Sequence, residues 1–322
     1  MEKHVLVALS RLEARHQDLY TSVADGSSHS CRLTCKATED VTKEDMADVN
    51  ALIGFVPVDV MKASPVLEWV HLSWSGVDAF IGPEGLPESV TVCNARGAHG
   101  LAVSEHMLAL TMMLVRRLHQ YRDNQLQCKW EQMGNTISIE SATVAVLGIG
   151  NIGGDYARKV KALGAHVLGV RRTNGEKPEG VDEQFTIDRL DEVLARADIV
   201  AMNLPGGEAT ANLMNEETLR KMKKGAFLIN VGRGTSVDQD ALIKVLEEEH
   251  LGGAAIDVCV PEPLPADHPL WKAKNLIITP HAASNYLLAE TFERFVRISA
   301  DNLKRYANGE PLQNVVDRNT GY

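Results

Sequence analysis

One segment of this chain is compatible with only a few folds. In it, an apolar strand is followed by a glycine-rich turn, a helix and a second apolar strand. Residues 143–173 have this order, with the sequence TVAVLGIGNIGGDYARKVKALGAHVLGVRRT. Gly148 allows a tight turn, Gly150 allows the backbone to approach a pyrophosphate, and Gly153 allows the helix to lie close to the sheet. The pattern predicts a dinucleotide-binding unit.

The two ends of this unit indicate how the dinucleotide is held. Amides at the helix start, from Asn151 and Ile152, are expected to face the phosphates. The second strand ends in Arg171, Arg172 and Thr173, with no acidic residue to hold a ribose 2′-hydroxyl. This favours NADP, with both arginines on the 2′-phosphate and Thr173 as a further donor. The alternatives are two solvated arginines and an NAD-linked enzyme in which they are idle.

Bulk properties narrow the class of protein. A length of 322 residues predicts about two domains. The net charge of −10 argues against general nucleic-acid or membrane binding, and no apolar run is long enough to span a bilayer. No signal-peptide pattern is present, so we expect a cytoplasmic protein. The five cysteines show neither zinc nor redox spacing, which predicts free thiols and no metal site.

Strands and helices alternate along most of the chain. Beyond the first unit we expect strands at 199–204, 226–231, 253–258 and 276–279, with helices at 216–222 and 239–249. Continuous apolar strands in this order predict a doubly wound parallel sheet. Shorter strands at 5–9, 51–55, 69–72 and 90–93 predict a smaller version of the same architecture. A long buried helix is expected at 102–120, and a final helix at 287–306 that packs on the first domain.

Three polar residues follow the ends of predicted strands, where ligands of open parallel sheets bind. Arg233 lies between Gly232 and Gly234, Glu262 lies between two prolines, and His281 follows a proline. Each residue alone has an ordinary alternative as a loop charge or a helix-terminal residue. Together they supply an acid, its carboxylate partner and an anion-binding guanidinium, and we interpret them as one catalytic group.

With these motifs in view, the chain resembles the D-isomer-specific 2-hydroxyacid dehydrogenases, the family of glyoxylate and hydroxypyruvate reductases, phosphoglycerate dehydrogenase and formate dehydrogenase. The resemblance covers nearly the whole chain and includes residues 75–78, 104–106 and 309–317. It implies an α/β protein in which a Rossmann nucleotide-binding domain, residues 101–285, is inserted into a flavodoxin-like substrate domain, residues 1–100 and 286–322. It also implies a homodimer, formed through the helix after Ala102.

The resemblance assigns roles to individual residues. Arg233 would bind the substrate carboxylate and carbonyl, His281 would be the general acid or base, and Glu262 would pair with His281. Reduction of a 2-oxo acid needs a proton at oxygen, and a carboxylate partner stabilises the imidazolium that supplies it. Glu262 in place of a Gln argues against formate dehydrogenase chemistry.

Further contacts follow from the same resemblance. Ser75 and the amides of Gly76 and Val77 would share the substrate carboxylate, and Trp74 is either a wall of the substrate pocket or ordinary core. Asp257 would meet the nicotinamide amide or merely cap a strand end. The remaining expected cofactor contacts are Leu204, Pro205, Val231, Gly232 and His281. Cys259 replaces a common aromatic residue and Ser75 a usual Ala, which leaves the substrate side chain open.

The sequence thus predicts an NADPH-dependent reductase of small 2-oxo acids such as glyoxylate, hydroxypyruvate or pyruvate. One alternative is an NAD-preferring D-2-hydroxyacid dehydrogenase. Another is a dinucleotide-sensing corepressor, because the C-terminal-binding proteins resemble the same family. The absence of a long polar tail or basic patch before Tyr322 favours the enzyme.

Overall fold

The computed structural model describes residues 2–29, 31–173, 175–284, 286 and 288–318. The chain divides into two compact units, which are described separately: unit 1 is Met1–His99 with Tyr286–Tyr322, and unit 2 is Gly100–Asn285. Several ends of the predicted segments, namely residues 1, 285, 287 and 322, lie outside the described residues.

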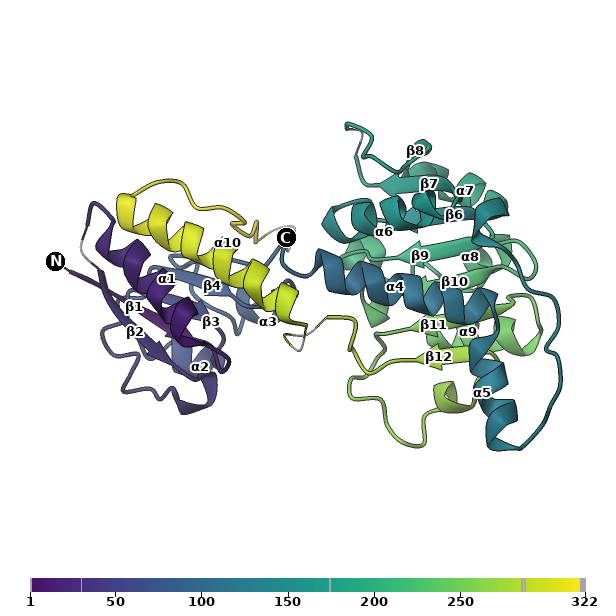
Figure 1. Cartoon of the computed structure of the whole chain (residues 1–322), viewed down its shortest axis with the longest axis horizontal. Coiled ribbons are helices and arrows are strands. Elements are labelled where there is room, and N and C mark those ends of the chain that lie inside the picture. Colours follow the sequence, from purple (N-terminus) through teal and green to yellow (C-terminus); the bar gives the residue numbers. More distant parts are fainter. Residues whose placement is uncertain (1, 30, 174, 285, 287, 319–322) are drawn as a thin grey trace. The chain divides into compact units, whose positions relative to one another are not determined.

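Unit 2 is built on a parallel sheet with seven strands among the described residues, in the order β12-β11-β10-β9-β6-β7-β8 (Figure 1). The strands are β6 (Thr143–Leu147), β7 (His166–Arg171), β8 (Glu183–Thr186), β9 (Ile199–Met202), β10 (Phe227–Asn230), β11 (Gly253–Ile256) and β12 (Leu276–Ile278). The order reverses direction beside β6, because β7 and β8 lie on one side of it and β9 to β12 on the other. This is the doubly wound arrangement in which ligands bind beyond the carboxyl ends of the strands.

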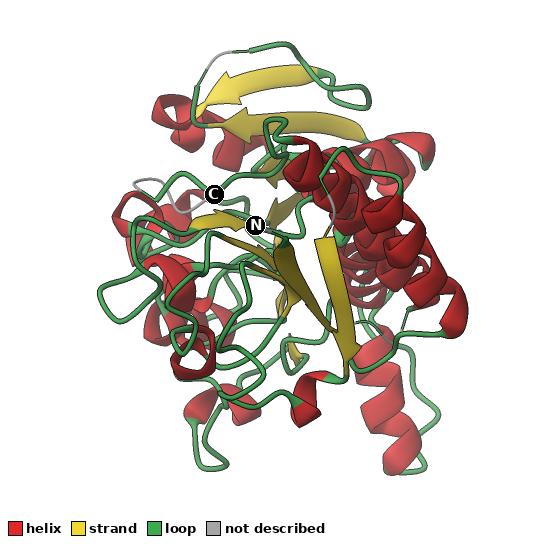
Figure 2. Cartoon of the chain, turned by 90° about the vertical axis from the view of Figure 1, so that its left-hand side faces the viewer, coloured by secondary structure: helices red, strands yellow, loops and turns green. Residues whose placement is uncertain are grey.

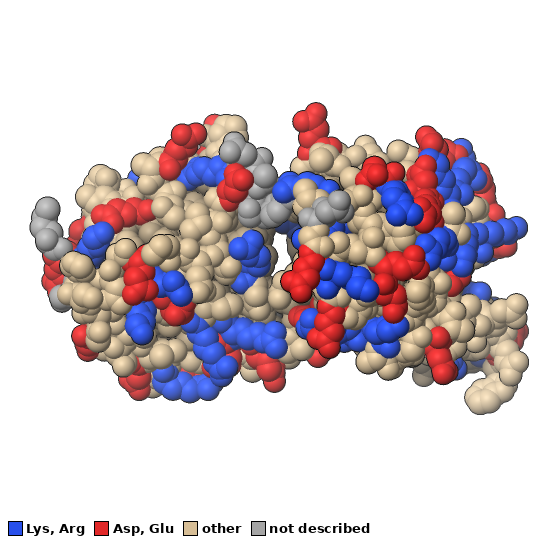
Figure 3. All heavy atoms as spheres, turned by 90° about the horizontal axis from the view of Figure 1, so that it is seen from above, with Lys and Arg blue, Asp and Glu red and all other residues tan. Residues whose placement is uncertain are grey.

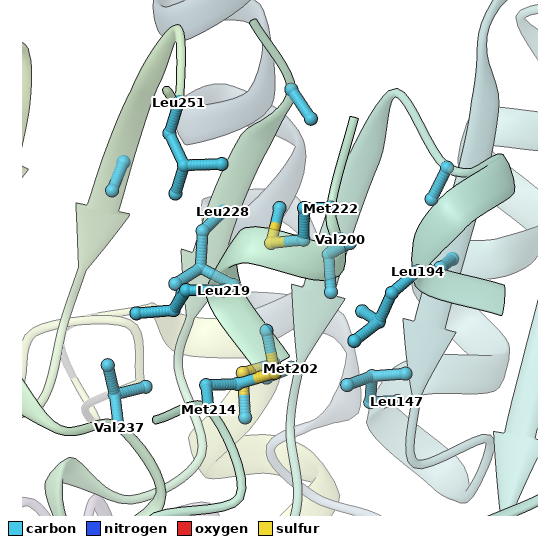
Figure 4. Packing of buried hydrophobic residues seen from close by; sticks show 14 of the residues in the cluster. Leu147, Leu194, Val200, Met202, Met214, Leu219, Met222, Leu228, Val237 and Leu251 are labelled. Atoms are coloured by element: carbon cyan, nitrogen blue, oxygen red, sulfur yellow. The ribbon is translucent and has the colours of Figure 1, made fainter. Parts of the chain in front are cut away.

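Helices cover both faces of this sheet. The helices of this unit are α4 (Gly100–Val115), α5 (Leu118–Leu126), α6 (Asn151–Ala162), α7 (Leu190–Arg196), α8 (Glu216–Lys221) and α9 (Gln239–Glu247), of which all but α5 pack on the sheet. One face packs against α4 and α6 through residues such as Met107 and Tyr156. The other face packs against α7, α8 and α9, and Figure 4 shows Leu194 beside Val200 of β9 and Leu219 beside Leu228 of β10. Because both faces are covered, central strands such as β9 and β11 are apolar throughout.

Unit 1 contains a smaller parallel sheet, with five strands among the described residues, in the order β2-β1-β3-β4-β5. The strands are β1 (Lys3–Ala8), β2 (Cys31–Lys36), β3 (Ala51–Gly54), β4 (Trp69–Leu72) and β5 (Thr91–Cys93), and the helices are α1 (Ala14–Asp25), α2 (Val58–Met61), α3 (Asp78–Ile81) and α10 (Ala289–Asn308). The strand order is the flavodoxin-like one. Figure 2 shows helices flanking the strands of the molecule.

Helices α1 and α10 lie side by side on one face of the unit 1 sheet (Figure 1). Tyr20 of α1 and Phe295 of α10 are fully buried there with residues of β1 and β3. Their packing includes a buried hydrogen bond of 2.6 Å between the Tyr20 and Ser299 hydroxyls. The last helix of the chain thus completes the core of the first hundred residues.

The predicted fold class, two doubly wound parallel-sheet domains, is confirmed. The single helix predicted at 102–120 is wrong, because α4 ends at Val115 and α5 begins at Leu118. Arg117 between them has a φ of 56°, a left-handed conformation that interrupts a helix, and its Nε donates to the Asn135 carbonyl at 2.8 Å. Strands β2 and β8 were not predicted, because both are edge strands with mixed polar and apolar residues.

Acidic and basic side chains are interspersed over the face that Figure 3 shows. Ion pairs among the described residues include Lys161 with Asp182. Within the described residues, no helix is long and apolar enough to cross a membrane. The five cysteines are free thiols.

Candidate functional site

The glycine-rich turn between β6 and α6 has the close packing that its sequence predicts. Gly148 has a φ of 96°, a backbone conformation that glycine adopts readily. A Cβ on Gly153 would lie 1.9 Å from the Gly148 carbonyl oxygen, so only glycine fits there. A Cβ on Gly150, in contrast, would meet nothing within 4 Å. Gly150 is the N-cap of α6, so the helix starts at an open backbone surface that fits a pyrophosphate.

The end of β7 presents the two predicted arginines. Arg171 is the last residue of the strand and is half-buried, and its Nη1 donates to the Glu176 carbonyl at 3.1 Å. Arg172 and Thr173 follow and are exposed. The neighbouring edge strand β8 ends at Thr186, so no carboxylate terminates either strand.

Two loops beyond the neighbouring strands are packed against each other. Leu204 and Pro205 follow β9, whereas Val231 and Gly232 follow β10. A Cβ on Gly232 would lie 2.6 Å from the Leu204 carbonyl oxygen, so this glycine permits the close approach. The amide of Gly232 donates to the buried Asn230 side chain at 3.1 Å. These predicted cofactor-binding residues therefore lie at one edge of the sheet.

Arg233 is fixed in the turn that follows β10. Its Nη1 donates to the Gly232 carbonyl at 2.9 Å, and its own carbonyl accepts from Asn230 Nδ2 at 2.9 Å. The next residue, Gly234, packs on the Cys259 carbonyl, which a Cβ would approach to 2.3 Å. The Arg233 turn is therefore in contact with the loop that carries Glu262.

Glu262 and His281 form a pair. The Nδ1 atom of His281 lies 2.7 Å from Glu262 Oε2, and the other carboxylate oxygen accepts from the Cys259 amide at 3.0 Å. The His281 side chain is 54% exposed and that of Glu262 is 37% exposed. With Nδ1 held by the carboxylate, Nε2 is the ring atom left for proton transfer. Burial, and then the Glu262 charge, raise the pKa of the Cys259 thiol, so it stays protonated.

The Asp257 side chain is buried and hydrogen-bonded to the segment that carries His281. Asp257 follows β11, is 1% exposed, and accepts hydrogen bonds from the Ala282 and Ala283 amides at 2.8 and 2.9 Å. Its backbone carbonyl accepts from the His281 amide at 2.8 Å. His281 has a φ of 51°, in the left-handed region. Asp257 therefore fixes the segment that carries His281, whatever contact it makes with a nicotinamide.

The predicted carboxylate loop in unit 1 is firmly held on its carbonyl side. His99 Nε2 lies 3.2 Å from the Ser73 carbonyl, which also accepts from the Tyr286 hydroxyl, and burial lowers the pKa of His99. Asn94 Nδ2 donates to the Ser75 carbonyl at 3.0 Å. Within the described part of the chain, no hydrogen bond is donated by the amides of residues 75–77. These amides fit an anion such as a carboxylate.

Trp74 is part of an aromatic cluster at the carboxyl ends of β3 and β4. Trp74 is 42% exposed, so it is not ordinary core. It stands edge to face with Phe55 at 6.5 Å and lies 6.2 Å from the Tyr286 ring. Phe55 was not singled out from the sequence, although its place after β3 is the signal that could have identified it.

Comparisons with known proteins agree with this description. Residues 108–283 match the family D-isomer specific 2-hydroxyacid dehydrogenase, NAD binding domain. A glyoxylate reductase from Korarchaeum cryptofilum is 33% identical over 293 residues, covering 87% of this chain and 86% of that protein.

Solved structures are similar over the full length. A D-isomer specific 2-hydroxyacid dehydrogenase from Xanthobacter autotrophicus, in complex with NADPH and MES, is 28% identical with a TM-score of 0.82, covering 100% of this chain and 99% of that one. An NADPH-dependent glyoxylate/hydroxypyruvate reductase from Sinorhizobium meliloti, in complex with NADP and sulfate, is 25% identical with a TM-score of 0.82, covering 100% of both chains.

A parallel α/β fold with a dinucleotide turn and a paired histidine and carboxylate defines a class of nicotinamide-dependent oxidoreductases. The chain belongs to the D-isomer specific 2-hydroxyacid dehydrogenase family. The predicted family and the predicted enzyme class, an NAD(P)-dependent oxidoreductase, are confirmed. Within the described residues, no three His, Cys, Asp or Glu side chains form a group that could hold a metal ion.

The glycine turn gives a first test. We expect Gly153→Ala to lower the free energy of unfolding by about 2 kcal/mol or more, because its Cβ collides with the Gly148 carbonyl. NADPH binding should weaken as the turn is displaced. The neighbouring Gly154 is the matched control, because a Cβ there meets nothing within 4 Å, and Ala at this helical position should stabilise by about 0.5–1 kcal/mol. Urea unfolding and NADPH fluorescence titration measure both effects. Equal behaviour of the two variants would contradict the close approach.

Proposed function

We propose that this protein reduces small 2-oxo acids to D-2-hydroxy acids with NADPH as the preferred cofactor. The His281–Glu262 pair is the observation that supports it most, because a histidine held by a carboxylate can give a proton to a carbonyl oxygen. Glyoxylate and hydroxypyruvate are the first substrates to test, since these acids appear in the names of similar proteins.

In the proposed reaction, residues of this chain transfer the proton and bind the substrate. NADPH, when bound, supplies the hydride that reaches the carbonyl carbon. His281 Nε2 gives its proton to the carbonyl oxygen, and Glu262 at Nδ1 stabilises the imidazolium before transfer. Arg233 is proposed to bind the substrate carboxylate. The amides of Gly76 and Val77, with Ser75 next to them in the chain, are proposed as further carboxylate contacts, and Trp74 as a contact of the substrate side chain. In the reverse direction His281 accepts the proton.

The preference for NADPH is proposed from the end of β7. The structure has no carboxylate at that strand end to accept a ribose 2′-hydroxyl, and it has Arg171, Arg172 and Thr173 instead. The glycines at 148, 150 and 153 fit the pyrophosphate shared by both cofactors. The arginines thus distinguish between the cofactors, and NAD stays the alternative.

Replacing Arg171 or Arg172 by Ala tests the cofactor preference. Because a hydrogen bond to a charged group contributes about 1.5–3 kcal/mol, we expect the KM for NADPH to rise about tenfold or more. The KM for NADH should change little, since NADH has no 2′-phosphate. Arg189→Ala, which removes an exposed arginine paired with Glu192, is the control. An unchanged KM for NADPH in both variants would remove the arginines from the cofactor site.

Replacing His281 by Ala tests the acid. General acid catalysis contributes about 100-fold or more, so kcat with glyoxylate or hydroxypyruvate should fall at least that far. Glu262→Gln should lower kcat less, because the glutamine keeps an acceptor but loses the charge that stabilises the imidazolium. His268→Ala, at the start of a short 3-10 helix after the Glu262 loop, is the control. Activity of the His281 variant within about tenfold of wild type would contradict this role.

We also propose that the protein is a homodimer and cytoplasmic. Helix α5 has no buried residue among those described, and Leu118, Leu126 and Trp130 are 49%, 67% and 102% exposed. Residues including Tyr121 and Trp130 line a surface hollow of about 710 Å³. Exposed apolar side chains gathered in this way are typical of a protein interface.

Sedimentation tests the dimer. Wild type should sediment as a dimer at micromolar concentration, and Leu126→Lys should shift the protein towards monomer because a charge cannot be buried there unpaired. Leu163→Lys, at an apolar residue that is 46% exposed after α6, is the matched control. A wild-type monomer would refute the proposal.

A further inference from the structure

A histidine outside the proposed catalytic group is connected to the segment that carries His281. His106 of α4 has its Nε2 atom 3.0 Å from the Thr279 hydroxyl, and that hydroxyl lies 2.5 Å from Asp257 Oδ1. His106 Nε2 is also 3.6 Å from the same carboxylate oxygen. The three side chains come from α4 and from the segments directly after β12 and β11. Residues separated by 173 positions in the sequence thus meet at one hydroxyl group.

The direction of each hydrogen bond follows from the number of protons. Asp257 is 1% exposed and accepts from two backbone amides, so it acts as an acceptor. The Thr279 hydroxyl has a single proton, which it donates to this carboxylate. The hydroxyl must then accept from His106, whose Nε2 atom bears a proton. The chain of donors runs from His106 through Thr279 to Asp257.

We propose that His106 is a positioning residue for catalysis, acting through Thr279 and Asp257 on the backbone that presents His281. The inference rests on the proposed function of His281. It assigns a task to a residue of α4 that has no role in the reaction scheme above, and it gives the buried carboxylate a partner besides backbone amides.

The backbone of His281 shows why such support matters. Its φ of 51° is a conformation that costs a residue with a Cβ free energy, and it persists only when the surroundings enforce it. The His281 amide donates to the Asp257 carbonyl at 2.8 Å, and the next two amides donate to the Asp257 side chain. Asp257 therefore holds three consecutive residues. A rotation of its carboxylate would release this segment, and the Thr279 hydroxyl with His106 behind it opposes that rotation.

The experiment compares isosteric variants in steady-state kinetics with NADPH and the better of glyoxylate and hydroxypyruvate. Thr279→Val removes the hydroxyl and keeps the shape, and His106→Leu removes the donor. We expect each to lower kcat about tenfold or more, since small misplacements of a reacting group are costly, and to change both KM values less than about twofold. Thr279→Ser and His106→Gln restore a hydroxyl and a donor at the Nε2 position. Both should recover kcat to within about threefold of wild type.

Thr111→Val is the matched control. The Thr111 hydroxyl lies on the same helix, is buried, and bonds to the Tyr156 hydroxyl at 2.8 Å and the Met107 carbonyl at 2.7 Å. The Thr111→Val change removes a buried hydrogen bond, as Thr279→Val does, but at a place away from His281. The free energy of unfolding should therefore fall while kcat is unchanged. The double variant His106→Leu/Thr279→Val should be no slower than the slower single variant, because both changes break one chain of donors.

Two results would overturn the proposal. One is a kcat near wild type in both Thr279→Val and His106→Leu, with only the melting temperature lowered as in Thr111→Val. The other is a double variant whose kcat loss is the product of the two single losses. Ring nitrogen NMR of histidine-labelled protein provides a readout independent of turnover: the His281 signals should move in Thr279→Val and not in Thr111→Val. If wild type reduces neither acid, the proposed function fails, and the NMR comparison alone decides on the positioning role.

Discussion

The buried carboxylate of Asp257 holds the segment that carries His281, the proposed general acid. Asp257 is 1% exposed, and burying an ionised carboxylate is tolerable only when hydrogen bonds replace its water. The bonds come from Thr279, Ala282 and Ala283, all in the segment that surrounds His281. These hydrogen bonds offset the free-energy cost of burying the charge. The same bonds fix the backbone around His281, the residue proposed to transfer the proton. The side chain expected to contact the nicotinamide thus also has a structural task.

The parallel sheet explains why the loops that carry Arg233, Glu262 and His281 lie at one edge. Strands β10, β11 and β12 are hydrogen-bonded neighbours that run in the same direction, so their carboxyl ends lie at one edge. Arg233, Glu262 and His281 follow these strands in that order along the chain. Gly234 then allows the first loop to touch Cys259, whose amide holds Glu262. The relative position of the loops after β10 and β11 is therefore determined by backbone contacts between them, and not by long side chains that bridge them.

The sequence was informative where a residue type is required by the backbone. The glycines of the dinucleotide turn predicted a close approach, and Gly153 has it; the apolar strands predicted sheets covered on both faces, and they are. The sequence was silent where the answer depends on partners far along the chain. Nothing local distinguishes His106 from any other histidine on an apolar helix, because its hydrogen-bond partners follow β11 and β12. The left-handed Arg117 likewise depends on the distant Asn135 carbonyl, so the break between α4 and α5 was not predicted.

The proposed proton-transfer residues and the aromatic residues of unit 1 have different expected effects on substrate choice. Backbone amides hold the Glu262 and Asp257 carboxylates, so changes there are expected to affect the proposed proton transfer for any 2-oxo acid. Trp74, in contrast, is held mainly by ring contacts with Phe55 and Tyr286 and presents a partly exposed face. An aromatic face discriminates by size and apolar area, at roughly 1–3 kcal/mol per methylene group. If Trp74 contacts the substrate side chain as proposed, we expect changes at these aromatic residues to alter substrate preference and to leave the proposed proton transfer unchanged.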